Sequence, residues 1–264
     1  MLGMKKGVEW EILNLFVDKS NRPKKTPRHE SAIQILLEES YSSGQVKNAL
    51  GKLEGSRHLT SQKYHIEKVG EAKFYYSKKL NEKFVQTQIP QKIKNIGYWI
   101  SRYSNIKTTR MLGEHLHYLV KGELRAQDFE IIEEKFVRRY REKEWIRSKH
   151  TLDLIAENKR KNLTIAVEIK NMLTSTPKTE IITKLEMCKH LGVTPVFACR
   201  WMEGHRKEIE QSGGFLWQFK KQLYPFGQES LVAEIKKRFN LPVYISGELP
   251  KESVNEFHNW IINQ

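Results

Sequence analysis

Three charged side chains lie in two apolar segments whose composition is typical of buried strands. Asp153 belongs to Leu152–Ala156, Glu168 to Leu163–Ile169, and Lys170 directly follows the second segment. A buried strand does not carry charge without a compensating role. Paired carboxylates can hold Mg²⁺, which prefers oxygen ligands, lowers the pKa of a bound water and stabilises the charge that develops on a phosphodiester. A neighbouring ammonium can orient or deprotonate that water, or offset negative charge, so these residues indicate metal-dependent phosphodiester hydrolysis.

A β-hairpin is the element that would bring the three side chains together. Both apolar segments are short and rich in Leu, Ile and Val, and the charged Glu157–Asn162 between them fits a tight turn. Because side chains alternate along a strand, Glu168 and Lys170 point to one face of the sheet. Pairing about the turn then places Asp153 near Glu168.

The motif resembles that of the PD-(D/E)xK nuclease superfamily, to which restriction endonucleases and archaeal-type Holliday-junction resolvases belong. Asp153 is followed by fourteen residues and then by Glu168-Ile169-Lys170, while Leu152 stands where the family often has Pro. The resemblance implies that Asp153 and Glu168 hold Mg²⁺, for which Mn²⁺ can substitute, and that Lys170 positions water or offsets charge. The alternative is a structural salt bridge at the end of a strand.

The elements around the hairpin match the α/β core of that superfamily, which has the order αβββαβ and a mixed sheet. The pattern predicts a helix over Arg110–Lys121, a strand near Phe136–Tyr140 with helix as the alternative, a helix starting at Thr176-Pro177 and ending near Gly192, and a strand over Thr194–Cys199. Further strands are predicted at Phe215–Phe219 and Leu241–Ser246, and further helices at Glu229–Phe239 and Lys251–Ile262.

The resemblance also suggests residues outside the hairpin. Nucleases of this superfamily usually begin with a helix whose Glu approaches the metal, and Glu114 is the matching candidate, with an ordinary surface Glu as the alternative. Lys178 and Lys184, near the start of the second predicted helix, are candidate phosphate contacts.

The amino-terminal third resembles a winged helix domain. Three helical patterns, near Val8–Val17, Glu30–Glu39 and residues 44–54, precede two alternating segments joined at Gly70-Glu71. In that fold the third helix enters the major groove and the hairpin approaches the backbone. The groove-facing candidates are Lys47, Asn48 and Lys52, and the phosphate-facing candidates are Lys63, Lys68 and Lys73. A solvated helix face, or a surface for protein contact, is the alternative interpretation.

Composition favours a polyanionic partner. The 264 residues include 46 Lys and Arg against 31 Asp and Glu, a formal net charge of +15. No apolar stretch approaches the length of a membrane-spanning helix, and the two cysteines, Cys188 and Cys199, fit a reducing cytoplasm. We expect a winged helix DNA-binding domain at residues 1–90, a linker at 91–109, and a nuclease domain at 110–264.

The function expected from these patterns is Mg²⁺-dependent endonucleolytic cleavage of duplex or branched DNA, with the winged helix assisting DNA binding. One rival is a non-catalytic DNA-binding regulator whose nuclease-like domain is structural, and another is a partner-recruiting protein that binds no DNA. Metal-dependent cleavage separates the enzyme from the regulator, and salt-sensitive DNA binding separates both from the third. The resemblance further implies a homodimer, because cutting two strands takes two active sites.

Overall fold

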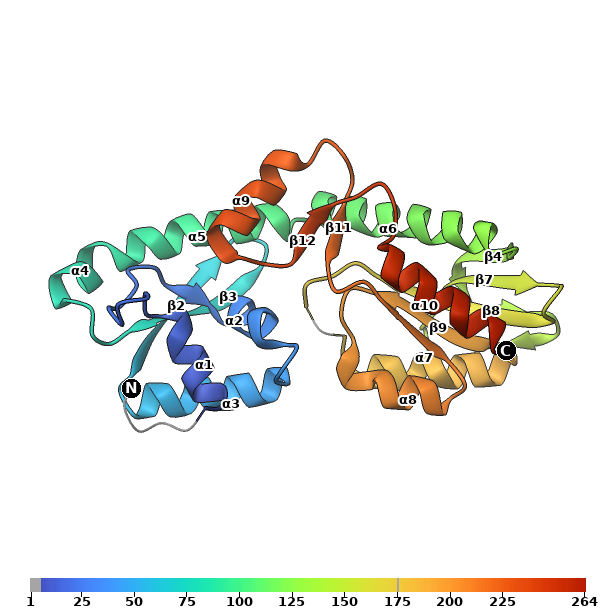
Figure 1. Ribbon diagram of the computed structural model, residues 1–264, viewed down its shortest axis with the longest axis horizontal. Coiled ribbons are helices and arrows are strands. Elements are labelled where there is room, and N and C mark those ends of the chain that lie inside the picture. The colour runs from blue at the N-terminus through green and yellow to red at the C-terminus, as the bar shows by residue number, and fades with distance from the viewer. Residues whose placement is uncertain (1–5, 175) are drawn as a thin grey trace. The chain divides into compact units, whose positions relative to one another are not determined.

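The computed structural model describes residues 6–174 and 176–264, which form two compact units (Figure 1). Unit 1 contains the chain up to Thr109 together with Ala233–Leu241, and unit 2 contains Arg110–Val232 and Pro242–Gln264. The predicted nuclease domain therefore begins where unit 2 begins. The predicted linker, residues 91–109, instead falls inside unit 1, and so does a short return segment that the sequence did not separate.

Unit 1 has three helices, a hairpin and two further helices. Its elements are α1 (Val8–Leu15), β1 (Arg28–His29), α2 (Glu30–Leu37), α3 (Ser43–Gly55), β2 (Leu59–Ile66), β3 (Gly70–Ser77), α4 (Glu82–Thr87) and α5 (Ile89–Tyr103). The antiparallel sheet has the order β1-β3-β2. The predicted order of helices and hairpin is thus present, and β1 is an addition, because two residues are too few to show a period.

The helix α3 begins at a capping box. The Ser42 side chain accepts the Gln45 N–H and the Gln45 side chain accepts the Ser42 N–H, so Ser42 is the cap. The apolar stripe of α3 (Val46, Ala49, Leu50 and Leu53) packs with residues of α1 and α2. The opposite face of α3 is therefore exposed.

Helix α5 occupies most of the segment that was predicted as a linker. Pro90 occupies its second position, where a missing N–H costs no helical hydrogen bond, so the proline starts the helix. One stripe of α5 is buried, and at Gly97 an added Cβ would lie 3.0 Å from the Tyr64 ring. The helix therefore packs closely on β2.

Unit 2 is built on a five-stranded mixed sheet with the order β10-β9-β8-β7-β4. Its main elements are α6 (Ile106–Ala126, which starts just before the unit boundary), β4 (Glu130–Val137), β7 (Leu152–Asn158), β8 (Leu163–Lys170), α7 (Lys178–Leu191), β9 (Thr194–Cys199), α8 (Arg206–Gln211), β10 (Phe215–Gln218) and α10 (Lys251–Ile262). Smaller elements are β5 (Arg139–Tyr140) paired with β6 (Lys143–Glu144), the 3-10 helix η1 (Glu203–His205), and β11 (Gln222–Tyr224) paired with β12 (Val243–Ile245). Helix α9 (Glu229–Phe239) crosses the unit boundary.

The predicted order of helix, three strands, helix and strand is present in α6, β4, β7, β8, α7 and β9. The first strand, β4, overlaps the predicted Phe136–Tyr140 only at Phe136 and Val137, so its position was predicted wrongly. It is a bulged edge strand with irregular pairing and little burial, which hides its period. The β7–β8 hairpin is antiparallel, while β8, β9 and β10 run parallel, with α7 as the connection between β8 and β9.

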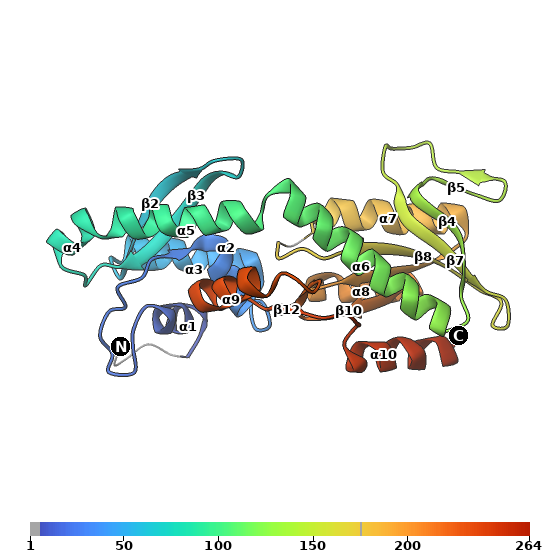
Figure 2. The ribbon, with the colours of Figure 1, turned by 90° about the horizontal axis from the view of Figure 1, so that it is seen from above.

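Helices cover both faces of this sheet (Figures 1 and 2). Side chains of α6 and α10 share one core with the inner residues of β7, β8 and β9, and α7 packs on the other face with Met187, Cys188 and Leu191. Cys188 and Cys199 are free thiols, and both are buried. Among residues 6–174 and 176–264, no helix combines the length and apolarity that crossing a bilayer requires.

His29 makes unit 1 sensitive to acid. Its ring lies 5.3 Å from that of Phe74, its Nδ1 is shielded without a hydrogen-bond partner, and burial lowers its pKa to about 4. A His whose folded-state pKa lies below its unfolded value loses stability as pH falls from the unfolded value towards the folded one. The free energy of unfolding of unit 1 should therefore drop between pH 6.5 and pH 4, by about 3 kcal/mol at most.

The variant His29→Phe should remove most of this loss, because a phenyl ring packs against Phe74 without taking up a proton. Urea unfolding of His29→Phe across this pH range measures the effect, with the exposed His65→Phe as the control. Equal acid sensitivity in the two variants would assign the loss to other groups.

Candidate functional site

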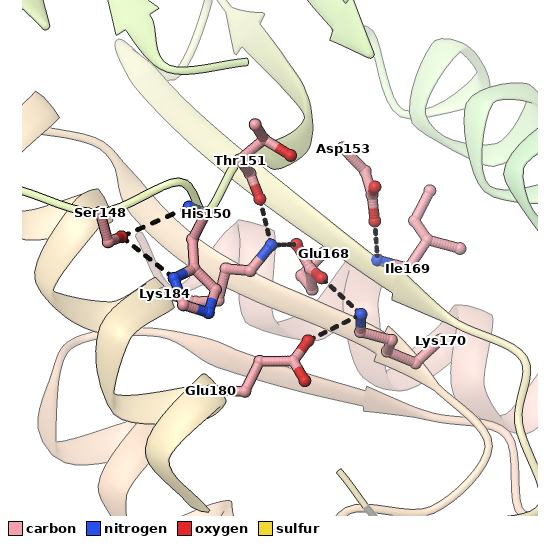
Figure 3. A network of polar contacts seen from close by, with 9 residues as sticks. All are labelled: Ser148, His150, Thr151, Asp153, Glu168, Ile169, Lys170, Glu180 and Lys184. Carbon is pink, nitrogen blue, oxygen red and sulfur yellow. Dashed lines mark hydrogen bonds and ion pairs between the residues drawn. The ribbon is translucent and has the colours of Figure 1, made fainter. Parts of the chain in front are cut away.

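The β7–β8 hairpin positions the predicted site. Its turn is stabilised by nearby residues. The Asn158 side chain accepts the Lys161 N–H at 3.1 Å, and Asn162 adopts a left-handed backbone with φ of 49°, which Asn tolerates. Leu154 pairs with Val167, and the same register carries Asp153 to a position across from Glu168. The hairpin prediction is therefore confirmed, including the proximity of the two carboxylates (Figure 3).

Glu168 is a buried carboxylate held by two ammonium groups. Its side chain is 4% exposed, its Oε1 lies 2.9 Å from Lys170 Nζ, and its Oε2 lies 2.7 Å from Lys184 Nζ. Lys184 also donates a hydrogen bond to the Thr151 carbonyl oxygen. Burial and the nearby Asp153 carboxylate raise the pKa of Glu168, and both lysines oppose that rise.

Asp153 faces the same region with a single hydrogen bond from the backbone. Its Oδ2 accepts the Ile169 N–H at 2.7 Å, so the side chain joins β7 to β8 at the end of their ladder. Burial raises the pKa of Asp153, and the Ile169 hydrogen bond and the two lysines offset the increase only in part. Burial therefore disfavours the ionised form of Asp153 despite the neighbouring lysines.

Lys170 is clamped between two carboxylates. Its Nζ lies 2.9 Å from Glu168 Oε1 and 2.9 Å from Oε1 of Glu180, a residue in the first turn of α7. Burial works to lower the pKa of Lys170, but Glu168 and Glu180 outweigh burial and raise it. The ammonium is consequently fixed in place beside the carboxylate pair.

Glu168 and Lys170 point to the same face of β8, because side chains alternate along a strand. Both side chains reach residues of α7, while Ile169 between them packs on the opposite side, against the core that includes α6 residues. The alternation predicted from the sequence is thus confirmed.

Glu114 does not join this group. It lies on α6, is largely exposed, and pairs with Arg110 at 2.8 Å. It lines a cavity of about 560 Å³ together with His117, Lys121 and Glu134, and Asp153 and Glu168 are not among the residues around that cavity. Throughout residues 6–174 and 176–264, no three His, Cys, Asp or Glu side chains are grouped so that they could hold a metal ion. The structure therefore does not group Glu114 with Asp153 and Glu168, because helical spacing alone does not determine which face of α6 meets the sheet.

Lys184 is also placed differently from its prediction as a phosphate contact. Its side chain is 7% exposed and pairs with Glu168, so it is an internal counter-charge. Lys178 is exposed, but its Nζ lies 2.9 Å from Glu208. In α7 itself, Pro177 is the cap and the helix starts at Lys178, one residue later than predicted.

The candidate nucleic-acid-binding residues of unit 1 are not all equally accessible, because some are exposed and others form ion pairs within the unit. Lys47, Asn48 and Lys52 lie on the exposed face of α3, as predicted, and Lys52 Nζ is 3.6 Å from Glu9. Lys68 is exposed in the hairpin turn. Lys73 instead turns to α3, where its Nζ contacts Glu54 Oε2 at 2.8 Å, so it is not free to approach a phosphate.

The sequence analysis did not identify Glu180 as the partner of Lys170 or Lys184 as the partner of Glu168. The sequence did carry a signal for Lys184, because it lies on the buried stripe of α7 with Ile181, Met187 and Cys188. A lysine on an apolar stripe needs a carboxylate partner. The neighbouring Ile182 lies outside this stripe and is 40% exposed.

Comparison with known proteins gives no match: no protein-family model, no curated protein sequence and no solved structure resembles this chain significantly. The resemblance to nucleases therefore depends on the motif and the order of elements.

The Glu168–Lys184 pair can be tested through stability. Lys184→Met leaves a buried carboxylate with one ammonium instead of two, and removing one partner of a buried pair costs about 3–5 kcal/mol. The double variant Lys184→Met/Glu168→Gln should cost less than the sum of the single variants, because it removes the unpaired charge. Urea unfolding measures all three.

The matched control is Lys178→Met, which breaks an exposed pair on the same helix and should change stability by less than about 1 kcal/mol. Similar losses for Lys184→Met and Lys178→Met would show that the buried pair is not coupled to the fold.

Proposed function

We propose that the chain is a Mg²⁺-dependent nuclease of the PD-(D/E)xK type that hydrolyses DNA phosphodiester bonds. The observation that carries the proposal is the meeting of Asp153, Glu168 and Lys170 where the β7–β8 ladder ends, with two neighbouring carboxylates beside a fixed ammonium. Chance matches to the spacing of such a motif need not bring its residues together, and here they share one face of a sheet.

The donor set fits Mg²⁺. Asp153 and Glu168 supply carboxylate oxygens, and Mg²⁺ is commonly held by one or two carboxylates, with water and substrate phosphate completing its shell. Burial raises the pKa of both carboxyl groups, so a divalent cation would supply the charge that the two lysines provide only in part. Mn²⁺ accepts the same oxygen ligands.

Each residue then has a defined role. A bound Mg²⁺ supplies an acidified water and a counter-charge for the phosphodiester. Asp153 and Glu168 would hold the Mg²⁺ at the end of the hairpin. Lys170, clamped by Glu168 and Glu180, positions the attacking water or offsets charge on the phosphate oxygens. Lys184 fixes the orientation of the Glu168 carboxylate through Oε2.

Unit 1 supports the DNA-binding part of the proposal. Its order of helices and hairpin is that of winged helix proteins, and the exposed face of α3 presents Lys47, Asn48 and Lys52, the residues expected to face a groove. The net charge of +15 favours a polyanion by counterion release.

One observation favours the regulator as the second candidate. Both oxygens of Glu168 are engaged by lysines, and a protein that never binds a metal would need such internal compensation. In that case the protein binds DNA but cuts none, with either Mg²⁺ or Mn²⁺.

Asp153→Asn tests the nuclease proposal. We expect cleavage of linear or branched DNA in Mg²⁺ to fall by at least about 100-fold while DNA affinity stays near that of the wild type, because the amide keeps the shape but loses the charge that holds the metal. The control is Asp128→Asn, an exposed acidic residue of unit 2 paired with Arg160. Wild-type cleavage by Asp153→Asn, or cleavage that persists in EDTA, contradicts the assignment.

Lys170→Met tests the mechanism. A charge that acts on the transition state affects the chemical step more than binding, so single-turnover cleavage should slow by about 10²- to 10³-fold with little change in affinity. Lys170→Arg should restore little, because a planar guanidinium does not replace a compact ammonium between Glu168 and Glu180.

Thermal unfolding of the same variants separates this role from a structural one, with the exposed Lys159→Met as the control. A lowered melting temperature combined with normal single-turnover rates would assign Lys170 to the fold alone.

A further inference from the structure

Helix α5 carries two stripes of side chains on nearly opposite faces. The inner stripe, Ile93, Ile96, Gly97 and Ile100, is buried, and Gly97 lies against the Tyr64 and Ile66 side chains of β2. The outer stripe is formed by Asn95, Tyr98, Trp99 and Arg102, whose spacing of three, four and seven residues places them on one face. We call these four residues the outer stripe of α5.

The outer stripe alternates aromatic rings with cations. The Tyr98 and Trp99 rings meet edge to face, with centroids 5.6 Å apart and an interplanar angle of 82°. The Arg102 guanidinium lies 5.3 Å from the Trp99 centroid and 6.0 Å from the Tyr98 centroid. Arg238 of α9, which belongs to the same unit, lies 4.9 Å from the Trp99 centroid.

The Arg238 guanidinium is oriented before any ligand arrives. Arg238 donates from Nη1 to Asn95 at 2.9 Å and from Nε to Glu234 at 2.6 Å, in addition to its contact with Trp99. Arg102 is exposed and lies against the Trp99 and Tyr98 rings. A planar guanidinium fixed in this way offers its N–H edge to a phosphate at low entropic cost.

Packing explains Trp99 but leaves Tyr98 without a partner in the core. Trp99 stabilises the end of α9 through Arg238, whereas the Tyr98 residue is 56% exposed. Lys94, one turn before Tyr98 on α5, is also exposed, and Glu234 is already paired with Arg238. An exposed ring between cations is the arrangement that binds nucleotides by stacking and by phosphate contact.

We propose that the outer stripe of α5 binds unpaired nucleotides, with the Tyr98 ring stacked on a base and Arg102 and Arg238 in contact with the backbone phosphates. Inside a duplex the faces of each base are covered by neighbouring base pairs, so a protruding ring reaches only a base that is unpaired. The inference rests on the proposed function in taking nucleic acid as the ligand. It narrows the substrate to DNA that contains a single-stranded part, as a branch, flap or tail does.

The test compares two DNAs with the full-length chain in EDTA, so that no cleavage occurs. One is a blunt duplex, and the other is the same duplex with a single-stranded oligothymidylate tail. Tyr98→Ala should lower the affinity for the tailed duplex by about 10-fold and leave the affinity for the blunt duplex unchanged. Tyr98→Phe should behave as the wild type, because it keeps the ring.

Two further arms make the test specific. Tyr118→Ala, which removes a tyrosine that is 75% exposed on α6, is the matched control and should change neither affinity. Arg102→Gln should reduce the slope of log affinity against log salt for the tailed duplex by about 0.7, the contribution of one phosphate of a single strand. A matching RNA tail shows whether the site distinguishes the two sugars.

The outcomes separate this inference from the proposed function. If Tyr98→Ala binds the tailed duplex as the wild type does, or loses equal affinity for both duplexes, the stacking site is overturned and the face is assigned to protein contact or to duplex backbone. If Tyr98→Ala shows the selective loss but the wild type cuts no DNA in Mg²⁺ or Mn²⁺, the binding site stands and the nuclease proposal fails.

Discussion

The burial of the Glu168 carboxylate constrains the arrangement of unit 2 more than any apolar contact does. A charge that is removed from water must be paired, and Glu168 obtains its two partners from different elements, Lys170 of β8 and Lys184 of α7. Lys184 extends the link to the Thr151 carbonyl, which directly precedes β7. The apolar packing of α7 has no preferred direction along the helix axis, whereas these hydrogen bonds do. We infer that they determine where α7 lies along the sheet and forbid a one-residue slip of β8, which would turn Glu168 into the opposite core.

The same constraint explains why the centre of the site could be predicted from the sequence. Asp153, Glu168 and Lys170 lie on a hairpin whose register follows from alternation and from a short turn, both local properties. The limits of α10 and β9 agree with the prediction for a similar reason, because their apolar periods are uninterrupted. The fold class, a mixed sheet between helices, follows from the order of such segments.

The positions of the other candidate residues depend on tertiary contacts, which the spacing of residues along the sequence does not reveal. Glu114 and Lys184 both lie one helix away from the hairpin, and the rotation of each helix decides that Lys184 enters the site and Glu114 does not. Lys73 could not be recognised as engaged, because its partner Glu54 comes from a different element. Residues 91–109 were assigned to a linker, whereas Ile89–Tyr103 form helix α5, with Pro90 in its first turn.

The division of α9 between the units has a consequence for synthesis of the chain. The segment Ala233–Leu241 returns to unit 1, where Phe239 meets the Tyr103 ring edge to face and Arg238 covers Trp99. A ribosome releases the chain from its amino terminus, and domains generally fold in that order. Here the first unit to emerge lacks one of its own pieces until nearly all of the second has been translated. A nascent chain must therefore hold α5 with part of its surface uncovered, and the last contacts of the first unit form only after the five strands of the main sheet of the second have left the exit tunnel.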